Sequence, residues 1–267
     1  MKKTKSFCVC FLSVLYLSIS AEAVVVETNN IAQTLEHATK NSLYVFDLDN
    51  TVIETSQHLG SDQWVSHMLD RLVSQGKTIQ EALADVIPKW IQIHERTEMK
   101  LVDPAVSEVL DKLKKKKISC IGLTKREPLS SNTTLEQLER LKIVFNATAP
   151  LENGHTFDHL KGTLYKNGVI FVASGMDKGP SLVAYLKKLK KMPSQIVLID
   201  DKLSHIKNVE SAVEALSIPF VGIRYGAADE KVKAFNPQIA DLQMKHFNQI
   251  LSDEEALHLL KVKEEAP

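Results

Sequence analysis

Short runs of aliphatic, β-branched and aromatic residues alternate with segments of helical periodicity along the chain, and this alternation limits the possible folds more than any other feature. The runs lack the regular polar alternation of a strand that faces water, which indicates strands buried on both faces. Such strands, when they alternate with helices, imply right-handed crossovers and a parallel, doubly wound α/β sheet. The predicted strands cover residues 43–46, 118–123, 169–172, 196–199 and 219–223.

Apolar residues spaced three and four apart predict the intervening helices. These helices cover residues 104–115, 134–141, 181–189 and 203–216. An Asn167-Gly168 pair lies between two strand-like runs and predicts a β-hairpin there.

The stretch 53–103 departs from the alternation. It contains helix-like blocks but no good strand, and it separates the first predicted strand from the second. We therefore predict a helical cap inserted after the first strand, placed where a lid could bury a substrate. The predicted helical blocks are residues 64–75, 78–90 and 91–99.

The N-terminus has the three zones of a secretory signal peptide. Residues 1–5 are basic, residues 7–19 are apolar or small, and residues 21–23 read Ala-Glu-Ala. The apolar zone is short for a membrane span, so we expect cleavage after Ala23, a periplasmic or secreted protein and no stable membrane anchor afterwards. The alternatives are an uncleaved anchor and a buried N-terminal helix. Cleavage would leave Cys120 as the sole cysteine, which excludes an internal disulfide.

The charge balance argues against a nucleic-acid partner. Lysine and arginine number 33, and so do aspartate and glutamate, whereas neutralising phosphates requires a basic excess or a basic stripe. The basic run at residues 114–117 ends a predicted helix, where cations favour the helix dipole and solvent. We expect no nucleic-acid partner, and the sequence indicates no particular oligomeric state.

Polar residues follow three of the predicted strands at their carboxyl ends, where ligands bind in open parallel sheets. These residues are Asp47 and Asp49, then Thr124, then Asp200 and Asp201, while Lys178 opens a predicted helix. Two or three carboxylates with water suit Mg²⁺, which prefers oxygen ligands. A lone Asp-x-Asp would more simply be a solvated loop, but four clusters in this order favour a site for phosphoryl transfer.

Each cluster has a part in such chemistry. Asp47 could attack phosphorus, and Asp49 could protonate the leaving oxygen. Closeness of the two carboxylates would raise one of their pKa values, as an acid catalyst requires. Thr124 offers a hydroxyl donor and Lys178 a positive charge for the phosphoryl group.

In these motifs the chain resembles the haloacid dehalogenase-like (HAD) superfamily, over about residues 43–225. The resemblance implies that Asp47 forms an aspartyl-phosphate, that Asp49 is the general acid and later activates water, and that Thr124 and Lys178 contact the phosphoryl group. It implies Mg²⁺ as the cofactor, held by Asp47, the backbone carbonyl of Asp49, and Asp201, with Asp200 next. His205 and Asn208 occupy the region where the family often has a further Asp or Asn.

The presence of Asp49 makes the motif resemble that of phosphatases and phosphotransferases, because similar dehalogenases lack this second aspartate. Residues 124–128 resemble a segment of secreted acid phosphatases in the superfamily. Arg126 is accordingly expected to contact phosphate, and Asn50 is a second candidate for substrate binding. The alternative for Arg126 is a surface arginine that caps the loop between strand and helix.

These inferences divide the chain into a signal peptide (1–23), a HAD-like core (24–52 and 104–267) and the cap (53–103). The predicted function is Mg²⁺-dependent hydrolysis of a small phosphate monoester through an aspartyl-phosphate. A phosphotransferase of the same chemistry and an exported HAD-fold binding protein with little turnover are the alternatives. The segment after Tyr225 has helical composition, with a break at Asn236-Pro237, and no motif that we can interpret.

Overall fold

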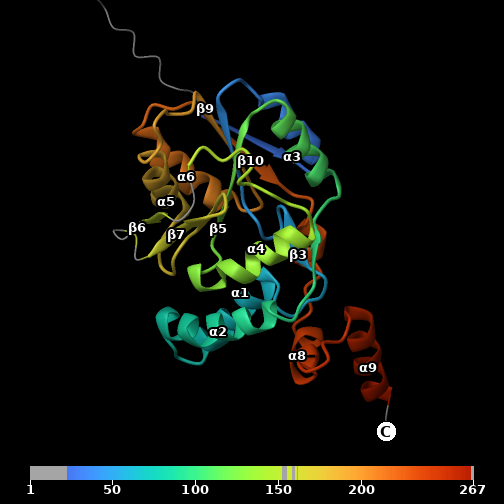
Figure 1. Cartoon of the computed structure of the whole chain (residues 1–267). Helices are drawn as coiled ribbons and strands as arrows, with labels where there is room; N and C mark the ends of the chain where they lie inside the picture. The colour runs from blue at the N-terminus through green and yellow to red at the C-terminus, as the bar shows by residue number, and fades with distance from the viewer. Residues whose placement is uncertain (1–22, 152–154, 158–159, 161, 266–267) are drawn as a thin grey trace, which may run out of the picture.

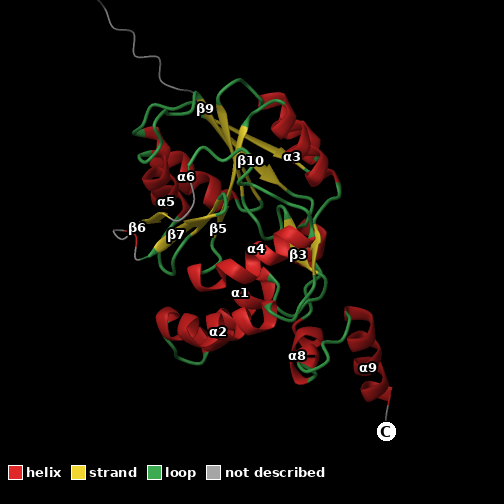
Figure 2. Ribbon diagram, in the orientation of Figure 1, coloured by secondary structure: helices red, strands yellow, loops and turns green. Residues whose placement is uncertain are grey.

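The computed structural model describes residues 23–151, 155–157, 160 and 162–265. An eight-stranded sheet has the strand order β1-β10-β9-β2-β5-β8-β7-β6. Figure 2 shows strands, in yellow, in the middle of the molecule with helices on either side. Its strands are β1 (Val24–Thr28), β2 (Ser42–Phe46), β5 (Ser119–Thr124), β6 (His155–Phe157), β7 (Thr163–Lys166), β8 (Val169–Phe171), β9 (Gln195–Asp200) and β10 (Phe220–Tyr225).

The six strands from β1 to β8 in this order pair in parallel, which confirms the predicted α/β class. Alternate residues of β2 enter opposite cores: Tyr44 and Phe46 face one side of the sheet, and Leu43 and Val45 face the other. Helix α3 (Ala105–Lys115), α4 (Ser131–Arg140) and the 3₁₀ turn η1 (Ile31–His37) contribute to the first core. Helices α5 (Lys178–Leu186) and α6 (Leu203–Glu214) contribute to the second, so the sheet is covered on both faces.

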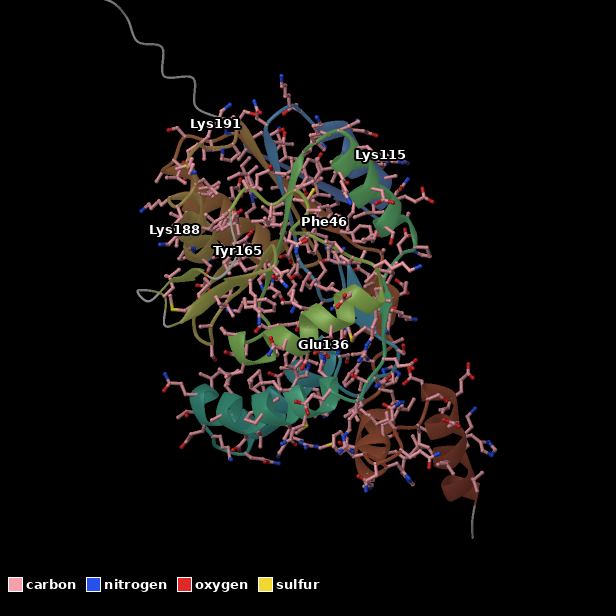
Figure 3. The ribbon with its side chains drawn as sticks, viewed as in Figure 1. Phe46, Lys115, Glu136, Tyr165, Lys188 and Lys191 are labelled. Carbon is pink, nitrogen blue, oxygen red and sulfur yellow. The ribbon has the colours of Figure 1, made fainter. Side chains whose placement is uncertain are left out.

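The predicted hairpin is confirmed, because β7 and β8 pair antiparallel around Asn167 and Gly168. Both turn residues have positive φ, 47° and 81°, as the favoured two-residue hairpin turns require. A Cβ at Gly168 would lie 2.6 Å from the backbone nitrogen of Asn146, so the close approach of that backbone also requires glycine. Figure 3 shows Phe46 and Tyr165 inside the molecule and Lys115 at its periphery.

Residues 53–103 form an outgrowth of two long helices, α1 (Asp62–Ser74) and α2 (Ile79–His94), which lie at the bottom of Figure 1. Two expectations for this stretch were wrong. It does contain strands, because β3 (Ile53–Thr55) and β4 (Met99–Leu101) pair antiparallel at its base. Three-residue strands are too short to show a period-two pattern.

The second error concerns α2, which is one helix rather than two. Pro88 lies inside it without ending it, although proline removes one hydrogen bond of the helix. A capping box between Thr78 and Glu81 begins the helix. The helix is then held by its apolar face, which contributes Val86, Trp90 and Ile93 to a core shared with α1.

The chain after β10 forms α7 (Asp229–Lys233), α8 (Pro237–Lys245) and α9 (Asp253–Glu265). The expected break is present, since the Asn236 side chain caps α8 and Pro237 is its first residue. α8 and α9 lie beside the α1–α2 outgrowth in Figure 1. The predicted signal peptide lies outside the described residues, except for Ala23. No helix in the described part of the chain has the length and apolar character to cross a membrane.

Candidate active site

Three neighbouring strands bring their polar carboxyl ends to one edge of the sheet. Strand β2 lies between β9 and β5, so Asp47 after β2 lies between Asp200 at the end of β9 and Thr124 at the end of β5. The backbone N–H of Asp47 donates to the Ile199 carbonyl at 2.9 Å, which extends the sheet pairing to this residue. The order of the strands therefore places residues more than 150 positions apart in one site.

Lys178 connects two of these strand ends. Its Nζ lies 2.6 Å from Oδ1 of Asp47 and 2.6 Å from Oδ2 of Asp200, and all three residues are buried. Burial alone would lower the pKa of Lys178, but the two carboxylates raise it to about 12. The lysine is therefore a fixed positive charge at the first turn of α5.

The two aspartates that Lys178 contacts belong to a cluster of possible metal ligands. Ligand atoms of Asp47, Asp200, Asp201 and His205 all lie within 4.8 Å of one another. Burial and the charge of Asp200 raise the pKa of Asp47 to about 6. Burial and the charges of Asp47 and Asp200 raise the pKa of Asp201 to about 9. Burial and the neighbouring carboxylates thus oppose ionisation of all three aspartates at once, and their oxygens are ligands suited to a hard cation.

The two adjacent aspartates differ in how many of their oxygens have partners. Asp200 Oδ2 pairs with Lys178, and Oδ1 accepts from the Lys202 N–H at 2.9 Å and lies 3.1 Å from His205 Nδ1. Although burial opposes it, Lys178 and His205 hold the pKa of Asp200 below its usual range. Asp201 Oδ2 accepts only a longer bond of 3.3 Å from Asn50 among the described residues. Among the described residues, Asp201 therefore has fewer hydrogen-bond partners than Asp200.

The Asp49 carboxylate lies apart from this cluster and pairs with Arg126. The guanidinium donates from Nε to Oδ2 at 2.9 Å and from Nη2 to Oδ1 at 2.7 Å. Burial raises the pKa of Asp49, but the paired arginine outweighs it and holds the pKa below the usual value. Asp47 is thus the member of the Asp-x-Asp motif with the raised pKa, and the causes are burial and Asp200 rather than Asp49.

Arg126 is buried, with 2% of its surface exposed, so the alternative of a surface arginine is wrong. Its Nη1 donates to Gln137 at 2.8 Å and to Thr134 at 3.2 Å, and its Cζ lies 5.5 Å from the centroid of the Trp90 ring. Gln137 in turn donates to the backbone carbonyl of His94 at 2.8 Å. This network joins the end of α2 to the site.

The remaining predicted residues also lie at the site. Thr124 is fully buried, and its hydroxyl accepts from the Arg126 N–H at 3.1 Å. Asn50 adopts a positive φ of 59°. Its side-chain amide donates to Asp201, and its side-chain oxygen accepts from Gln63 at 3.3 Å. The structure therefore brings every predicted residue to one place, although their roles in catalysis and substrate binding stay predictions.

Sequence reasoning missed several residues of the site. Lys202 pairs with Asp62 of α1 at 2.6 Å, which links the sheet to the outgrowth. His94 donates from Nε2 to the Gly60 carbonyl at 2.8 Å as the neutral ring, because burial and Arg126 lower its pKa to about 4. Lys202 directly follows the acidic pair in the chain, so its place beside the site could have been predicted. No sequence signal joins His94 to the site, because its contacts come from distant segments.

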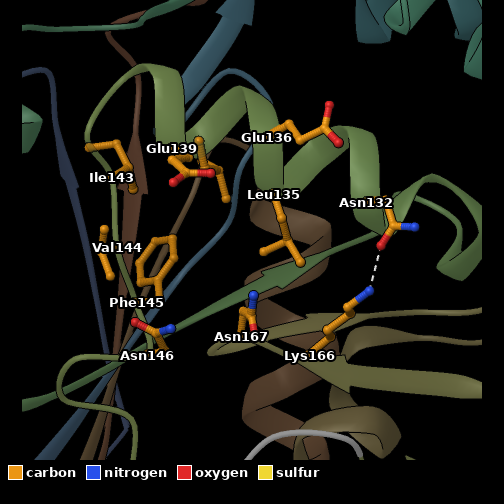
Figure 4. A pocket seen from close by; sticks show the side chains of 11 residues that line it. Asn132, Leu135, Glu136, Glu139, Ile143, Val144, Phe145, Asn146, Lys166 and Asn167 are labelled. Atoms are coloured by element: carbon orange, nitrogen blue, oxygen red, sulfur yellow. Dashed lines mark hydrogen bonds between the residues drawn. The ribbon is translucent and has the colours of Figure 1, made fainter.

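The site opens into a cleft of about 390 Å³ between the sheet edge and the α1–α2 outgrowth. Its floor is polar and includes Asp47, Asp49, Arg126, Asp201 and Lys202. A second cavity, of about 410 Å³, lies between α4 and the β7–β8 hairpin, where Lys166 donates to Asn132 (Figure 4). The residues that line it include none of the strand-end residues of the site.

Curated relatives cover most of this chain. A Chlamydia pneumoniae protein named "Putative outer membrane protein" is 27% identical and covers 87% of each chain. A Chlamydia trachomatis protein of the same name is 24% identical and covers 92% of this chain and 95% of its own. An uncharacterized protein of Rickettsia prowazekii is 22% identical over 88% of this chain and 89% of its own.

Among solved structures, a haloacid dehalogenase-like family hydrolase from Streptococcus pneumoniae has a TM-score of 0.40 and 14% identity, and covers 73% of this chain and 98% of its own. A class C acid phosphatase from Bacillus anthracis with bound tungstate has a TM-score of 0.33 and 17% identity, and covers 77% of this chain and 76% of its own. Residues 25–257 match the family described as "Protein of unknown function (DUF2608)". The match spans most of the chain, which therefore belongs to the DUF2608 family.

Proposed function

We propose that this protein is a Mg²⁺-dependent phosphatase of the HAD type, which hydrolyses a phosphate monoester through a phosphorylated Asp47. The observation that carries the proposal is the position of Lys178, whose Nζ lies 2.6 Å from both Asp47 and Asp200 at the carboxyl edge of the sheet. A buried cation beside a carboxylate of raised pKa, at the end of an open cleft, is the arrangement that an anionic ester and an aspartate nucleophile both need.

The acidic cluster fits a hard divalent cation. The raised pKa values of Asp47 and Asp201 indicate that burial and the neighbouring carboxylates oppose their ionisation, and a bound cation would favour the ionised forms. Asp47, Asp201 and the backbone carbonyl of Asp49 would hold Mg²⁺, with Asp200 next. When bound, the ion would supply positive charge that offsets the negative charge of the nucleophile and the phosphoryl oxygens.

The proposed reaction has two steps. A carboxylate oxygen of Asp47 forms a bond to phosphorus while the bond from phosphorus to the ester oxygen breaks, and that oxygen takes a proton from Asp49. The Asp49 carboxylate then takes a proton from a water whose oxygen attacks phosphorus, and the bond to Asp47 breaks. The products are the free alcohol and inorganic phosphate, and both aspartates return to their starting states.

Asp49 must be protonated before the first step, whereas its pairing with Arg126 holds its pKa low. A phosphate group offers the guanidinium the same bidentate geometry as a carboxylate, with more negative charge. We propose that the ester phosphate takes over the arginine from Asp49. Release from Arg126 leaves burial as the main influence on Asp49 and raises its pKa, so Asp49 takes up a proton from solvent when the substrate binds. It returns that proton when phosphate leaves and Arg126 pairs with it again.

Release of inorganic phosphate from a panel of monoesters, with Mg²⁺ and with a chelator, tests the proposal. Hydrolysis that requires Mg²⁺ and is absent in Asp47→Asn would support it, and no hydrolysis by the wild type would contradict it. The same reaction with an added alcohol acceptor separates a phosphatase from a phosphotransferase, because a phosphotransferase yields the acceptor's phosphate ester instead of inorganic phosphate. Binding of monoesters without turnover would favour the exported binding protein.

We also propose export to the cell envelope or beyond it. The three zones of the N-terminus and the names of the chlamydial relatives support this location. N-terminal sequencing of protein recovered outside the cytoplasm should start at Val24 or within a few residues of it. A cytoplasmic protein that starts at Met1 would contradict export.

A further inference from the structure

The cleft has a charged floor at the sheet edge and an apolar roof, formed by α1 and α2. The residues that α1 and α2 contribute recur at spacings of three and four, so each helix turns one face toward the cleft. The apolar members of these two faces are Val65 and Leu69 of α1 and Ile79, Leu83, Ile87 and Trp90 of α2.

The roof also has few polar atoms left for a ligand. Asp62 is bound by Lys202 at 2.6 Å, and the Ser66 hydroxyl donates to the Asp62 backbone carbonyl at 3.1 Å. The indole N–H of Trp90 donates to the Gly60 carbonyl at 2.8 Å. Among the described residues that α1 and α2 contribute to the cleft, the polar groups therefore already have partners within the protein.

The apolar roof is nevertheless not covered by the rest of the protein. Ile79 is 53% exposed, and Val65, Leu69, Leu83 and Ile87 are only half-buried. Apolar surface in contact with water is a source of binding free energy for any ligand group that covers it. The roof is continuous with the floor that would take a phosphoryl group, so a ligand that fills the cleft has a charged end and an apolar end.

We propose that the substrate is the phosphate monoester of an apolar alcohol, alkyl or aromatic, whose carbon skeleton packs against α1 and α2. This inference rests on the proposed phosphatase function and adds the class of leaving group. A sugar or other polyhydroxylated leaving group would lose its water against the roof without gaining hydrogen bonds, which disfavours it.

A series of straight-chain monoesters, from methyl to hexyl phosphate, measures this preference in the wild type. Full burial of each added methylene group corresponds to a gain of up to about fourfold in kcat/KM, until the chain outgrows the cleft. We expect hexyl and phenyl phosphate to be better substrates than glucose 6-phosphate. If the esters are hydrolysed but kcat/KM does not change with chain length, or is higher for the sugar phosphate, the inference is overturned while the phosphatase function stays in place.

Matched variants assign the preference to the roof. Leu83→Gln and Ile87→Gln place an amide in the apolar surface and should reduce the ratio of kcat/KM for hexyl over methyl phosphate about tenfold. Val73→Gln is the control, because Val73 is 43% exposed on α1 and does not line the cleft. It should leave the ratio unchanged. An equal ratio in all four proteins, with thermal unfolding confirming that each is folded, would contradict the assignment.

Binding of alkylphosphonates, which have no ester bond to hydrolyse, separates the two proposals. Calorimetric titration in Mg²⁺ buffer should give tighter binding of hexylphosphonate than of methylphosphonate, and Leu83→Gln should remove the difference. Chain-length-dependent binding without turnover of any ester would overturn the phosphatase function but support the apolar subsite. Equal binding of the two phosphonates would overturn the subsite.

Discussion

Arg126 and Asp49 form a bidentate ion pair at 2.7 and 2.9 Å, although 77 positions separate them in the chain. Both residues line the cleft, and the arginine also donates to Gln137 and Thr134. Its position gives Arg126 two tasks in the proposed reaction: it keeps Asp49 ionised in the resting protein, and it binds the phosphate when the ester arrives.

Replacing Arg126 by lysine should therefore impair catalysis more than folding. Lysine keeps the charge but cannot form the two parallel hydrogen bonds of the guanidinium. We expect kcat/KM to fall by about 10²-fold, in the range found when one donor to a developing charge is lost. Steady-state kinetics with the unfolding temperature measured alongside would test this. Activity close to that of the wild type in the lysine variant would show that the bidentate contact is not used.

The two adjacent aspartates should respond in opposite ways to removal of their charge. Asp201→Asn should weaken Mg²⁺ binding by at least about tenfold, because a neutral amide oxygen replaces the carboxylate of the proposed ligand. In metal-free buffer the same change should raise the unfolding temperature, since the pKa of Asp201 is raised to about 9 by burial and by its like-charged neighbours.

Asp200→Asn is the matched variant for this comparison. It breaks the buried pair with Lys178 and should lower the free energy of unfolding by about 3 kcal/mol in metal-free buffer. Calorimetric titration with Mg²⁺ and thermal unfolding without it distinguish the two residues. Equal Mg²⁺ affinity in the wild type and Asp201→Asn would exclude Asp201 as a ligand, and Asp200 would be the next candidate.

His94 should make the folded protein sensitive to mild acid. Burial and the charge of Arg126 lower its pKa to about 4, whereas the unfolded chain has an ordinary histidine pKa of about 6.5. The unfolded state therefore binds more protons between these values, and stability is lost as the pH falls from about 6.5 toward 4. The loss from this residue amounts to about 3 kcal/mol.

Other groups titrate in the same range, so the variant His94→Gln isolates the effect. Glutamine can still donate to the Gly60 carbonyl but does not gain a charge in acid. Chemical denaturation at a series of pH values should give a shallower dependence in the variant than in the wild type. Parallel curves for the two proteins would show that His94 is not the cause.

The strand ends could be predicted from the sequence because their signal is local. A buried run that stops at Asp47, Thr124 or Asp200 marks the edge of a parallel sheet, and the sheet order then brings those residues together. The partner of Asp49 could not be predicted, since nothing near residue 49 or residue 126 indicates that the two carboxylate oxygens meet the guanidinium. The strands β3 and β4 could not be predicted for a similar reason: they are stabilised by pairing with each other across 44 to 48 positions of the chain.

The pKa values of the Asp-x-Asp motif were predicted only in part. One pKa of the pair is raised, that of Asp47, but its causes are burial and then Asp200 on another strand. The pKa of Asp49, the predicted acid, is instead held low by Arg126. Tertiary contacts also decide that Asp200 pairs with Lys178 and His205, while Asp201 accepts only a longer bond from Asn50 among the described residues. The sequence contains both aspartates but no information on which way each side chain points.

Direct detection of a phosphorylated Asp47 tests the proposed covalent mechanism. Asp49→Asn should slow turnover about 10²- to 10⁴-fold by removing the proton transfers. An intermediate is therefore sought in this variant and in the wild type. Each is mixed with Mg²⁺ and a hydrolysed monoester, quenched in acid and analysed by peptide mass spectrometry. We expect one added phosphoryl group on the peptide that contains Asp47, and none in Asp47→Asn. Turnover with no adduct in either protein, or an adduct on another residue, would contradict the proposed mechanism.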